Sequence, residues 1–230
     1  MKNILVLDTE TTLGFGSPLI YDFGYRIVDR EGTTIKEVSV LIEEVFDTHA
    51  LMNSAYYAEK VPMYQKMYDR GEIGKTTFVK AFKQFVKDVK HYKVDVISAY
   101  NVAFDVKALN NTIRMLDSAN FEKQTLEKLV SQKNKKVLCI WNLACETLLD
   151  TDEYREYADK HNFKSEKGNY KTSAEVAFAY LKNMPDFVEK HTALEDVGIE
   201  IEILLHILNH YKGNITYGLH YGSWKKVQVI

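Results

Sequence analysis

The sequence predicts an α/β fold in which a mixed five-stranded sheet is flanked by helices. Two observations predict it. Three short runs rich in Ile, Leu and Val lie within residues 3–42 and show no helical spacing. After residue 76, short apolar runs alternate with segments whose apolar residues recur every three or four positions. A strand meander followed by alternating strands and helices is typical of a mixed sheet with helices on its faces.

The first three strands come from the N-terminal third of the chain. "NILVLDTE", residues 3–10, is an uninterrupted apolar run before its acidic end, which predicts a central strand buried on both faces. "LIYDFGYRIVDREGTTIKEVSVLI", residues 19–42, holds two runs separated by the turn-like "DREG". This pattern predicts an antiparallel hairpin beside the first strand.

Helices and two further strands follow. A helix is expected from Thr76, because one face carries Phe78, Val79, Phe82, Phe85, Val86 and Val89. The fourth and fifth strands are expected in "VDVISAY" (94–100) and "KKVLCI" (135–140), with a helix over 101–116 between them that has Asn101 as its N-cap. Further helical segments are expected near 141–149, 152–161, 172–181 and 192–211.

The 230 residues are expected to form a single domain. Residues 44–74 and 150–172 are polar and rich in tyrosine, and they are poorly periodic for a sheet, so they are expected to be helical excursions beside the core. The C-terminal tail, residues 214–230, has β character and no assigned place in this sheet.

Composition narrows the class of protein. The formal net charge of −2 excludes a generally basic protein that coats nucleic acid, but it does not exclude an enzyme that binds only a strand end. The two cysteines, Cys139 and Cys145, suit a reducing compartment and are expected to be small buried side chains. No apolar run is long enough to span a membrane, and no signal peptide is visible, so a cytoplasmic location is expected.

Two acidic residues stand at the end of the first predicted strand. Asp8 and Glu10 are two positions apart, so both carboxylates point to the same side of the sheet. In α/β sheets, ligands bind at the carboxyl ends of strands. Two acids on a solvated strand end would explain this pair alone equally well.

Two more acids are expected in first helical turns. Asp105 follows the Asn101 cap, and Asp196 follows Thr192 and Glu195, which form the pattern of a capping box. Acids at helix N-termini ordinarily add about 0.3–1 kcal/mol of stability, which is the simpler reading of each. If all four acids converged, they would need counter-ions, and oxygen ligands would select two Mg²⁺ or Mn²⁺ ions.

His191 lies five positions before Asp196, a separation that puts the two side chains on different faces of a continuous helix. A helix that begins between them leaves the histidine in a loop, from which it can fold back toward the carboxylate. An unperturbed imidazole pKa near 6.5 suits a general base.

These residues resemble a known family. "DTE" (8–10), "NVAFD" ending at Asp105 and "HTALED" (191–196) are similar, in this order, to the three motifs of the DEDDh 3′→5′ exonucleases. The flanking "SAYYAEKVPMY" (54–64) and "GNYKTSAEVAFAYL" (168–181) are more similar to phage or prophage-encoded members than to proofreading subunits. Tyr100 departs from the pattern, because many relatives carry His there.

The resemblance implies a ribonuclease H-like fold, two Mg²⁺ or Mn²⁺ ions, and release of nucleoside monophosphates from DNA, chiefly at single-stranded 3′ ends. It implies that His191 is the general base and that the metal ligands are Asp8, Glu10, Asp105 and Asp196. Substrate contacts are expected from Thr9, Thr11, Asn101 and Phe104. RNA trimming and a non-cutting binding module remain alternatives, and any replication or repair partner would be a separate chain.

Three other segments have more than one interpretation. "GEIGKTT" (71–77) is similar to a phosphate-binding loop but has Asp69 where that loop needs glycine, so a loop and helix cap are expected. "DTETT" (8–12) is also similar to phosphatases that use an aspartyl nucleophile, which need a second Asp at position 10. Tyrosines interleaved with lysines either cover the sheet or form a mobile flap that stacks bases near the active site: Tyr56, Tyr57, Lys60, Tyr64, Lys66 and Tyr68.

Overall fold

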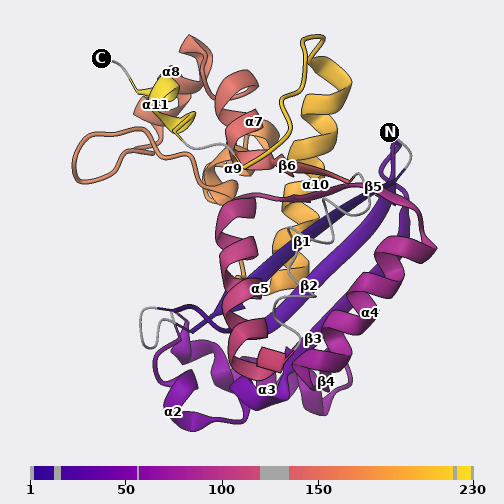
Figure 1. The fold of residues 1–230 in the computed structure, drawn as a ribbon. Coiled ribbons are helices and arrows are strands. Elements are labelled where there is room, and N and C mark those ends of the chain that lie inside the picture. Colours follow the sequence, from indigo (N-terminus) through magenta and orange to yellow (C-terminus); the bar gives the residue numbers. More distant parts are fainter. Residues whose placement is uncertain (1–2, 13–16, 56, 120–134, 220–221, 229–230) are drawn as a thin grey trace.

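The computed structural model describes residues 3–12, 17–55, 57–119, 135–219 and 222–228. Its centre is a mixed sheet with the strand order β4-β3-β2-β1-β5-β6 (Figure 1). Strand β1 (Asn3–Thr11) pairs antiparallel with β2 (Ile20–Asp29) and parallel with β5 (Val94–Ala99). The predicted α/β class with a mixed sheet and flanking helices is confirmed.

The remaining strands extend the sheet on both sides. Strand β3 (Thr34–Ile42) forms the predicted hairpin with β2, and β6 (Lys136–Cys139) lies parallel to β5. The carboxyl ends of β1, β5 and β6 therefore share one edge of the sheet. The pairing register of β1 with β2 shifts between Glu10 and Thr11, at this same edge.

The sheet has one strand more than the predicted five. Strand β4 (Gly74–Thr76) pairs parallel with the end of β3, where the sequence predicted only a loop and a helix cap. A three-residue edge strand is too short to show a periodic pattern, and it forms through backbone pairing alone. The cap was predicted correctly, since the Thr77 side chain accepts a hydrogen bond from the Lys80 backbone.

The helices cover both faces of the sheet. Helices α4 (Phe78–His91) and α5 (Val102–Leu116) pack on one face, while α7 (Ile140–Thr147), α9 (Ala174–Lys182) and α10 (Ala193–His210) pack on the other (Figure 1). Along β1, Leu5 and Leu7 face the first group and Ile4 and Val6 face the second. This double burial explains the uninterrupted apolar run at the N-terminus.

Two segments lie beside this core. The chain after β3 forms the short helices α1 (Glu43–Phe46) and α2 (His49–Met52), a 3₁₀ turn η2 (Ala58–Lys60) and α3 (Val61–Asp69). Helix α8 (Asp152–Lys160) follows α7. Within the described residues, no helix is both long and apolar enough to cross a bilayer.

In the described part of the tail, residues 214–219 and 222–228, the structure has helix α11 (Trp224–Val227) and no strand, which corrects the β character that its composition indicated. Val227 is fully buried and Trp224 is partly buried in the second core, so these apolar residues serve packing instead of strand pairing.

The start of α10 lies directly on β2. A Cβ atom added at Gly24 would be 2.6 Å from the Leu194 backbone nitrogen and 2.7 Å from the Ala193 carbonyl carbon. Backbone atoms cannot rotate away as a side chain can, so only glycine lets the helix approach this closely.

We expect Gly24→Ala to lower the free energy of unfolding by about 1–3 kcal/mol, because α10 must shift to relieve the overlap. Gly74→Ala is the matched control, since its added Cβ would lie 3.4 Å from Val40 Cγ1, an ordinary contact distance. Urea unfolding followed by circular dichroism measures both variants. Equal, small losses in the two variants would contradict the close approach.

Candidate active site

The two acids of β1 lie at the carboxyl edge of the sheet. Glu10 is buried and Asp8 is half-buried. Burial, followed by the nearby carboxylates Asp105 and Glu200, raises the pKa of Asp8 well above its usual range. Burial, followed by Asp196 and Asp22, raises the pKa of Glu10 to about 9. Carboxylates shift each other's pKa only at short distances, so the acids of β1, α5 and α10 lie close together.

Asp105 reaches this edge from the first turn of α5. Its side chain is buried, and its Oδ1 accepts a 2.8 Å hydrogen bond from Thr9 Oγ1. Burial raises the pKa of Asp105 to about 7 despite this bond, which opposes the shift. The sequence predicted that Thr9 contacts the substrate. In the structure its hydroxyl instead donates its hydrogen bond to the Asp105 carboxylate.

The other predicted substrate residues occupy different surroundings. Thr11 is buried beside the register shift, so its side chain does not face solvent. Asn101 stands at the N-cap position of α5, but its side chain makes no capping hydrogen bond, which corrects that expectation. Asn101 is exposed and Phe104 is 39% exposed, so both are accessible at the start of α5.

Helix α10 begins between His191 and Asp196, as predicted. Thr192 is its N-cap residue and Ala193 its first helical residue. The capping box differs from the expected form, because Thr192 Oγ1 donates to Glu195 Oε2 at 3.0 Å and caps no backbone amide. His191 has a φ of 54°, a left-handed conformation that few non-glycine residues adopt.

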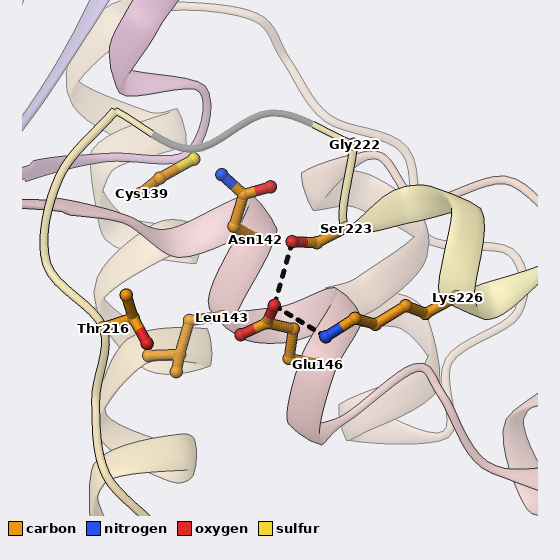
Figure 2. A pocket seen from close by; sticks show the side chains of 8 residues that line it. All are labelled: Cys139, Asn142, Leu143, Glu146, Thr216, Gly222, Ser223 and Lys226. Atoms are coloured by element: carbon orange, nitrogen blue, oxygen red, sulfur yellow. Dashed lines mark hydrogen bonds and ion pairs between the residues drawn. The ribbon is translucent and has the colours of Figure 1, made fainter.

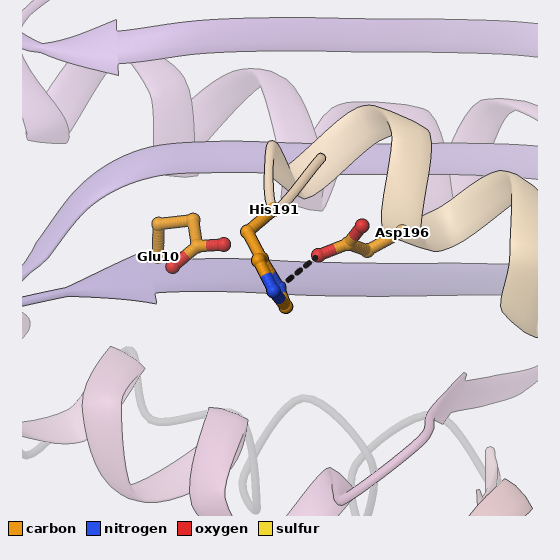
Figure 3. Close-up of side chains that lie close together, drawn as sticks. All are labelled: Glu10, His191 and Asp196. Carbon is orange, nitrogen blue, oxygen red and sulfur yellow. Dashed lines mark ion pairs between the residues drawn. The ribbon is translucent and has the colours of Figure 1, made fainter. Parts of the chain in front are cut away.

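This backbone turn brings the imidazole to the carboxylates. Figure 3 shows the ring between Glu10 and Asp196, and one ligand atom from each of the three residues lies within 4.8 Å of the other two. The His191 Nδ1 atom is 3.8 Å from Asp196 Oδ2 and 3.6 Å from Glu189 Oε2. Burial and then the charge of Lys60 lower the imidazole pKa, so the ring is neutral at neutral pH.

Two residues of the 57–69 segment contact this loop. The Tyr57 ring stacks on His191 with centroids 4.4 Å apart. Lys60 Nζ donates a 2.6 Å hydrogen bond to the Lys190 carbonyl oxygen and lies 4.4 Å from the Tyr57 ring centroid. Among the other tyrosines of the predicted flap, Tyr64 is buried, while Tyr56 lies outside the described residues. Mobility of the segment stays a prediction.

Three buried or nearly buried acids were missed by sequence reasoning. Asp22 is the cross-strand partner of Glu10, Glu200 lies four residues after Asp196 on α10, and Glu189 lies two residues before His191. The i, i+4 spacing could have identified Glu200, because it shares a helix face with Asp196. No local signal identifies Asp22, since the strand register brings it to Glu10.

The site fits divalent cations by the chemistry of its donors. Among the described residues near Glu10 and Asp105, three buried carboxylate oxygens have no hydrogen-bond partner: Asp22 Oδ1, Asp196 Oδ1 and Glu200 Oε2. Unpartnered buried oxygens are costly, and a hard cation is the ligand that would satisfy them.

A separate cavity lies between α7 and the tail. It encloses about 310 Å³ and contains none of the predicted site residues (Figure 2). Glu146 Oε1 accepts hydrogen bonds from Ser223 Oγ at 3.1 Å and Lys226 Nζ at 2.9 Å. The charges of Glu146 and Lys226, which line this cavity, are therefore paired with each other. Cys139 on its wall and Cys145 nearby are buried free thiols, as predicted.

Comparisons with known proteins identify the fold. No family model matches the chain, and no curated protein matches it in sequence. The cell-death related nuclease CRN-4 is similar in structure, with a TM-score of 0.53 and 12% identity over 92% of this chain and 65% of that chain. A 3′-exonuclease described by 3′-end specific recognition of a histone mRNA stem-loop has a TM-score of 0.54 and 13% identity over 91% and 64%.

E. coli Exonuclease I in complex with a dA16 oligonucleotide has a TM-score of 0.55 and 14% identity, and the match covers 92% of this chain and 41% of that chain. The present chain thus spans between about two-fifths and just under two-thirds of the length of these structures. The likeness confirms the predicted fold class, the ribonuclease H-like mixed sheet flanked by helices.

The raised pKa values predict how stability depends on pH in chelator. The folded-state pKa values are about 6 for Asp22, 7 for Asp105 and Asp196, 8 for Glu189 and 9 for Glu10. The unfolded groups titrate near pH 4. Between about pH 4 and pH 9 the folded state therefore binds more protons, and its stability falls as pH rises.

Urea unfolding across this range in EDTA measures the decline. Asp105→Asn should make it shallower, and excess Mg²⁺ should reduce it by favouring the ionised carboxylates. A free energy of unfolding that rises with pH in EDTA would contradict the burial of these acids.

Proposed function

We propose that this chain is a metal-dependent 3′→5′ exonuclease that releases nucleoside monophosphates from DNA, chiefly at single-stranded 3′ ends. The proposal rests on one observation. Carboxylates from β1, α5 and α10 converge at the carboxyl edge of the sheet beside a loop imidazole. The fold shared with known nucleases supports it, and so does the order of the three sequence motifs.

The ligands for two divalent cations, Mg²⁺ or Mn²⁺, would be Asp8, Glu10, Asp105 and Asp196. When bound, such ions supply a polarised water and charge stabilisation for phosphodiester hydrolysis. The fold of the chain holds the ligand side chains in position. Thr9 fixes one oxygen of Asp105, and the α10 backbone fixes Asp196 relative to Glu10.

His191 would act as the general base. Its lowered pKa keeps it neutral and able to accept a proton at neutral pH. Stacking on Tyr57 holds the ring plane, so that the imidazole stays beside Glu10 and Asp196. After proton transfer, the carboxylates around it would stabilise the imidazolium.

The substrate strand would approach over the start of α5. The exposed Phe104 ring could stack on a base, and the exposed Asn101 could donate to the strand. RNA is the alternative substrate. Relatives in fold include one solved with a dA16 oligonucleotide and one described by recognition of a histone mRNA stem-loop. DNA is the substrate of this proposal, and the matched DNA and RNA oligonucleotides below decide between the two.

The non-cutting binding module is disfavoured, because no acid of the motif set and no histidine is missing. The relation to phage enzymes, a cytoplasmic location and a separate replication or repair partner stay predictions.

The direct test uses matched 5′-labelled single-stranded DNA and RNA oligonucleotides with Mg²⁺, Mn²⁺ or chelator, resolved to single nucleotides. We expect a metal-dependent ladder that shortens from the 3′ end, faster on DNA. Asp105→Asn and Asp196→Asn should lower the rate by at least about 10³-fold, since each removes a proposed metal ligand. Fully active variants would refute the assigned site, and a faster RNA ladder would name RNA as the substrate.

Replacing His191 should separate proton transfer from metal binding. His191→Asn is expected to reduce the turnover rate by about 10²–10⁴-fold while substrate KM changes little. The acidic limb of the pH–rate profile should disappear with the imidazole. An unchanged limb would assign the base to another group. His206→Asn, on the distal part of α10, is the matched control.

A further inference from the structure

A second group of potential ligands lies beside His191 and borders the group that contains Asp196. Glu175 projects from the first turn of α9, and Glu189 and His191 belong to the connection before α10. One ligand atom from each residue lies within 4.8 Å of the other two. None of the three converging acids of β1 and α5 belongs to this group, and His191 is the residue that it shares with the proposed active site.

Glu189 is the observation that points to a ligand. Its side chain is only 9% exposed, and its Oε1 is buried without a hydrogen-bond partner among the described residues. Its Oε2 lies 3.6 Å from His191 Nδ1, too far for a hydrogen bond. Ionising this carboxyl group beside a second carboxylate and an imidazole would require a nearby positive charge, which a bound cation would supply.

The protein charges nearby do not supply enough compensation. The Lys60 ammonium acts on Glu189, but it also acts on Glu10 and Asp196. It is held by the Lys190 carbonyl oxygen at 2.6 Å. One ammonium therefore acts on three carboxylates, those of Glu10, Glu189 and Asp196.

The donor set selects the class of cation. One imidazole nitrogen with two carboxylates suits Zn²⁺ and similar transition metals, whereas Mg²⁺ prefers oxygen alone. Tetrahedral Zn²⁺ needs ligand atoms roughly 3.4 Å apart, so the three side chains would have to close by about 1 Å. Three protein ligands leave one position open to water.

We propose that Glu175, Glu189 and His191 form a regulatory binding site for Zn²⁺ or a similar transition metal, separate from the Mg²⁺ or Mn²⁺ ligands. Occupancy engages the imidazole, and it therefore withdraws the general base from the active site. This inhibitory consequence rests on the proposed exonuclease function. The binding itself does not.

The test is titration of the full chain with ZnCl₂ in excess Mg²⁺, followed by calorimetry, without nucleic acid. We expect one Zn²⁺ per chain, and Glu175→Gln and Glu189→Gln should each weaken binding by about tenfold or more. Glu202→Gln is the matched control, because Glu202 is a half-exposed α10 residue paired with Lys182. It should bind Zn²⁺ as the unchanged chain does.

The variant Asp105→Asn tests whether Zn²⁺ binds among the active-site acids instead of at Glu175, Glu189 and His191. Undiminished Zn²⁺ binding by this variant, with a Zn²⁺-induced shift of the His191 ring ¹⁵N resonances, supports the separate site. Loss of binding in Asp105→Asn with retention in Glu175→Gln would place the ion among the active-site acids and overturn the proposal. Unchanged circular dichroism and thermal unfolding check that each variant folds.

Hydrolysis assays then test regulation. Zn²⁺ should inhibit the Mg²⁺-supported ladder, and the concentration for half-inhibition should rise by about tenfold in Glu175→Gln, in step with its weaker binding. Equal Zn²⁺ sensitivity in the two proteins would overturn the regulatory role. If no ladder appears but calorimetry gives the expected pattern, the exonuclease function fails and the metal site stands.

Discussion

Burial of several carboxylates at one edge of the sheet is the constraint on which the rest of this structure depends. Asp8, Glu10 and Asp105 are kept from full hydration, and each raises the cost of ionising its neighbours. The chain offsets this cost only partly. The Thr9 hydroxyl and backbone amides donate to Asp105, and the Lys60 ammonium acts on Glu10. Such a site is electrostatically incomplete by itself, and it is suited to divalent cations.

The same constraint explains how α10 is held. Asp22 accepts hydrogen bonds from the Ala193 amide at 3.0 Å and from the Tyr64 hydroxyl at 2.9 Å, which ties the first turn of α10 to β2 and to α3. Gly24 permits the close contact beneath. The position of His191 therefore depends on a strand, a helix and the segment between β3 and α4. That segment also brings Tyr57 and Lys60 to the histidine loop, so the excursion forms one wall of the site.

His191 stands between two groups of acids. Glu10 and Asp196 form one group, and Glu175 and Glu189 form the other. The His191 Nδ1 atom lies 3.8 Å from Asp196 Oδ2 and 3.6 Å from Glu189 Oε2, so the two groups meet at one ring atom. A histidine in this position responds to any cation that enters either group. The positive φ at His191 makes the loop a sharp turn, and the turn places its ring within reach of both. Catalytic and regulatory chemistry would thus compete for one imidazole.

The sequence by itself predicted five of the six strands, the burial of the first strand on both faces, the start of α10 after His191, and the four acids and the histidine as candidate site residues. These follow from local patterns: burial on both faces of β1, helical spacing, and residues in first turns. The tertiary structure decided the features that depend on pairing between distant segments of the chain. The β1–β2 register brings Asp22 to Glu10, Thr9 turns to Asp105, and β4 exists only because β3 lies beside it. Such contacts join residues far apart in the chain, and local periodicity carries no information about them.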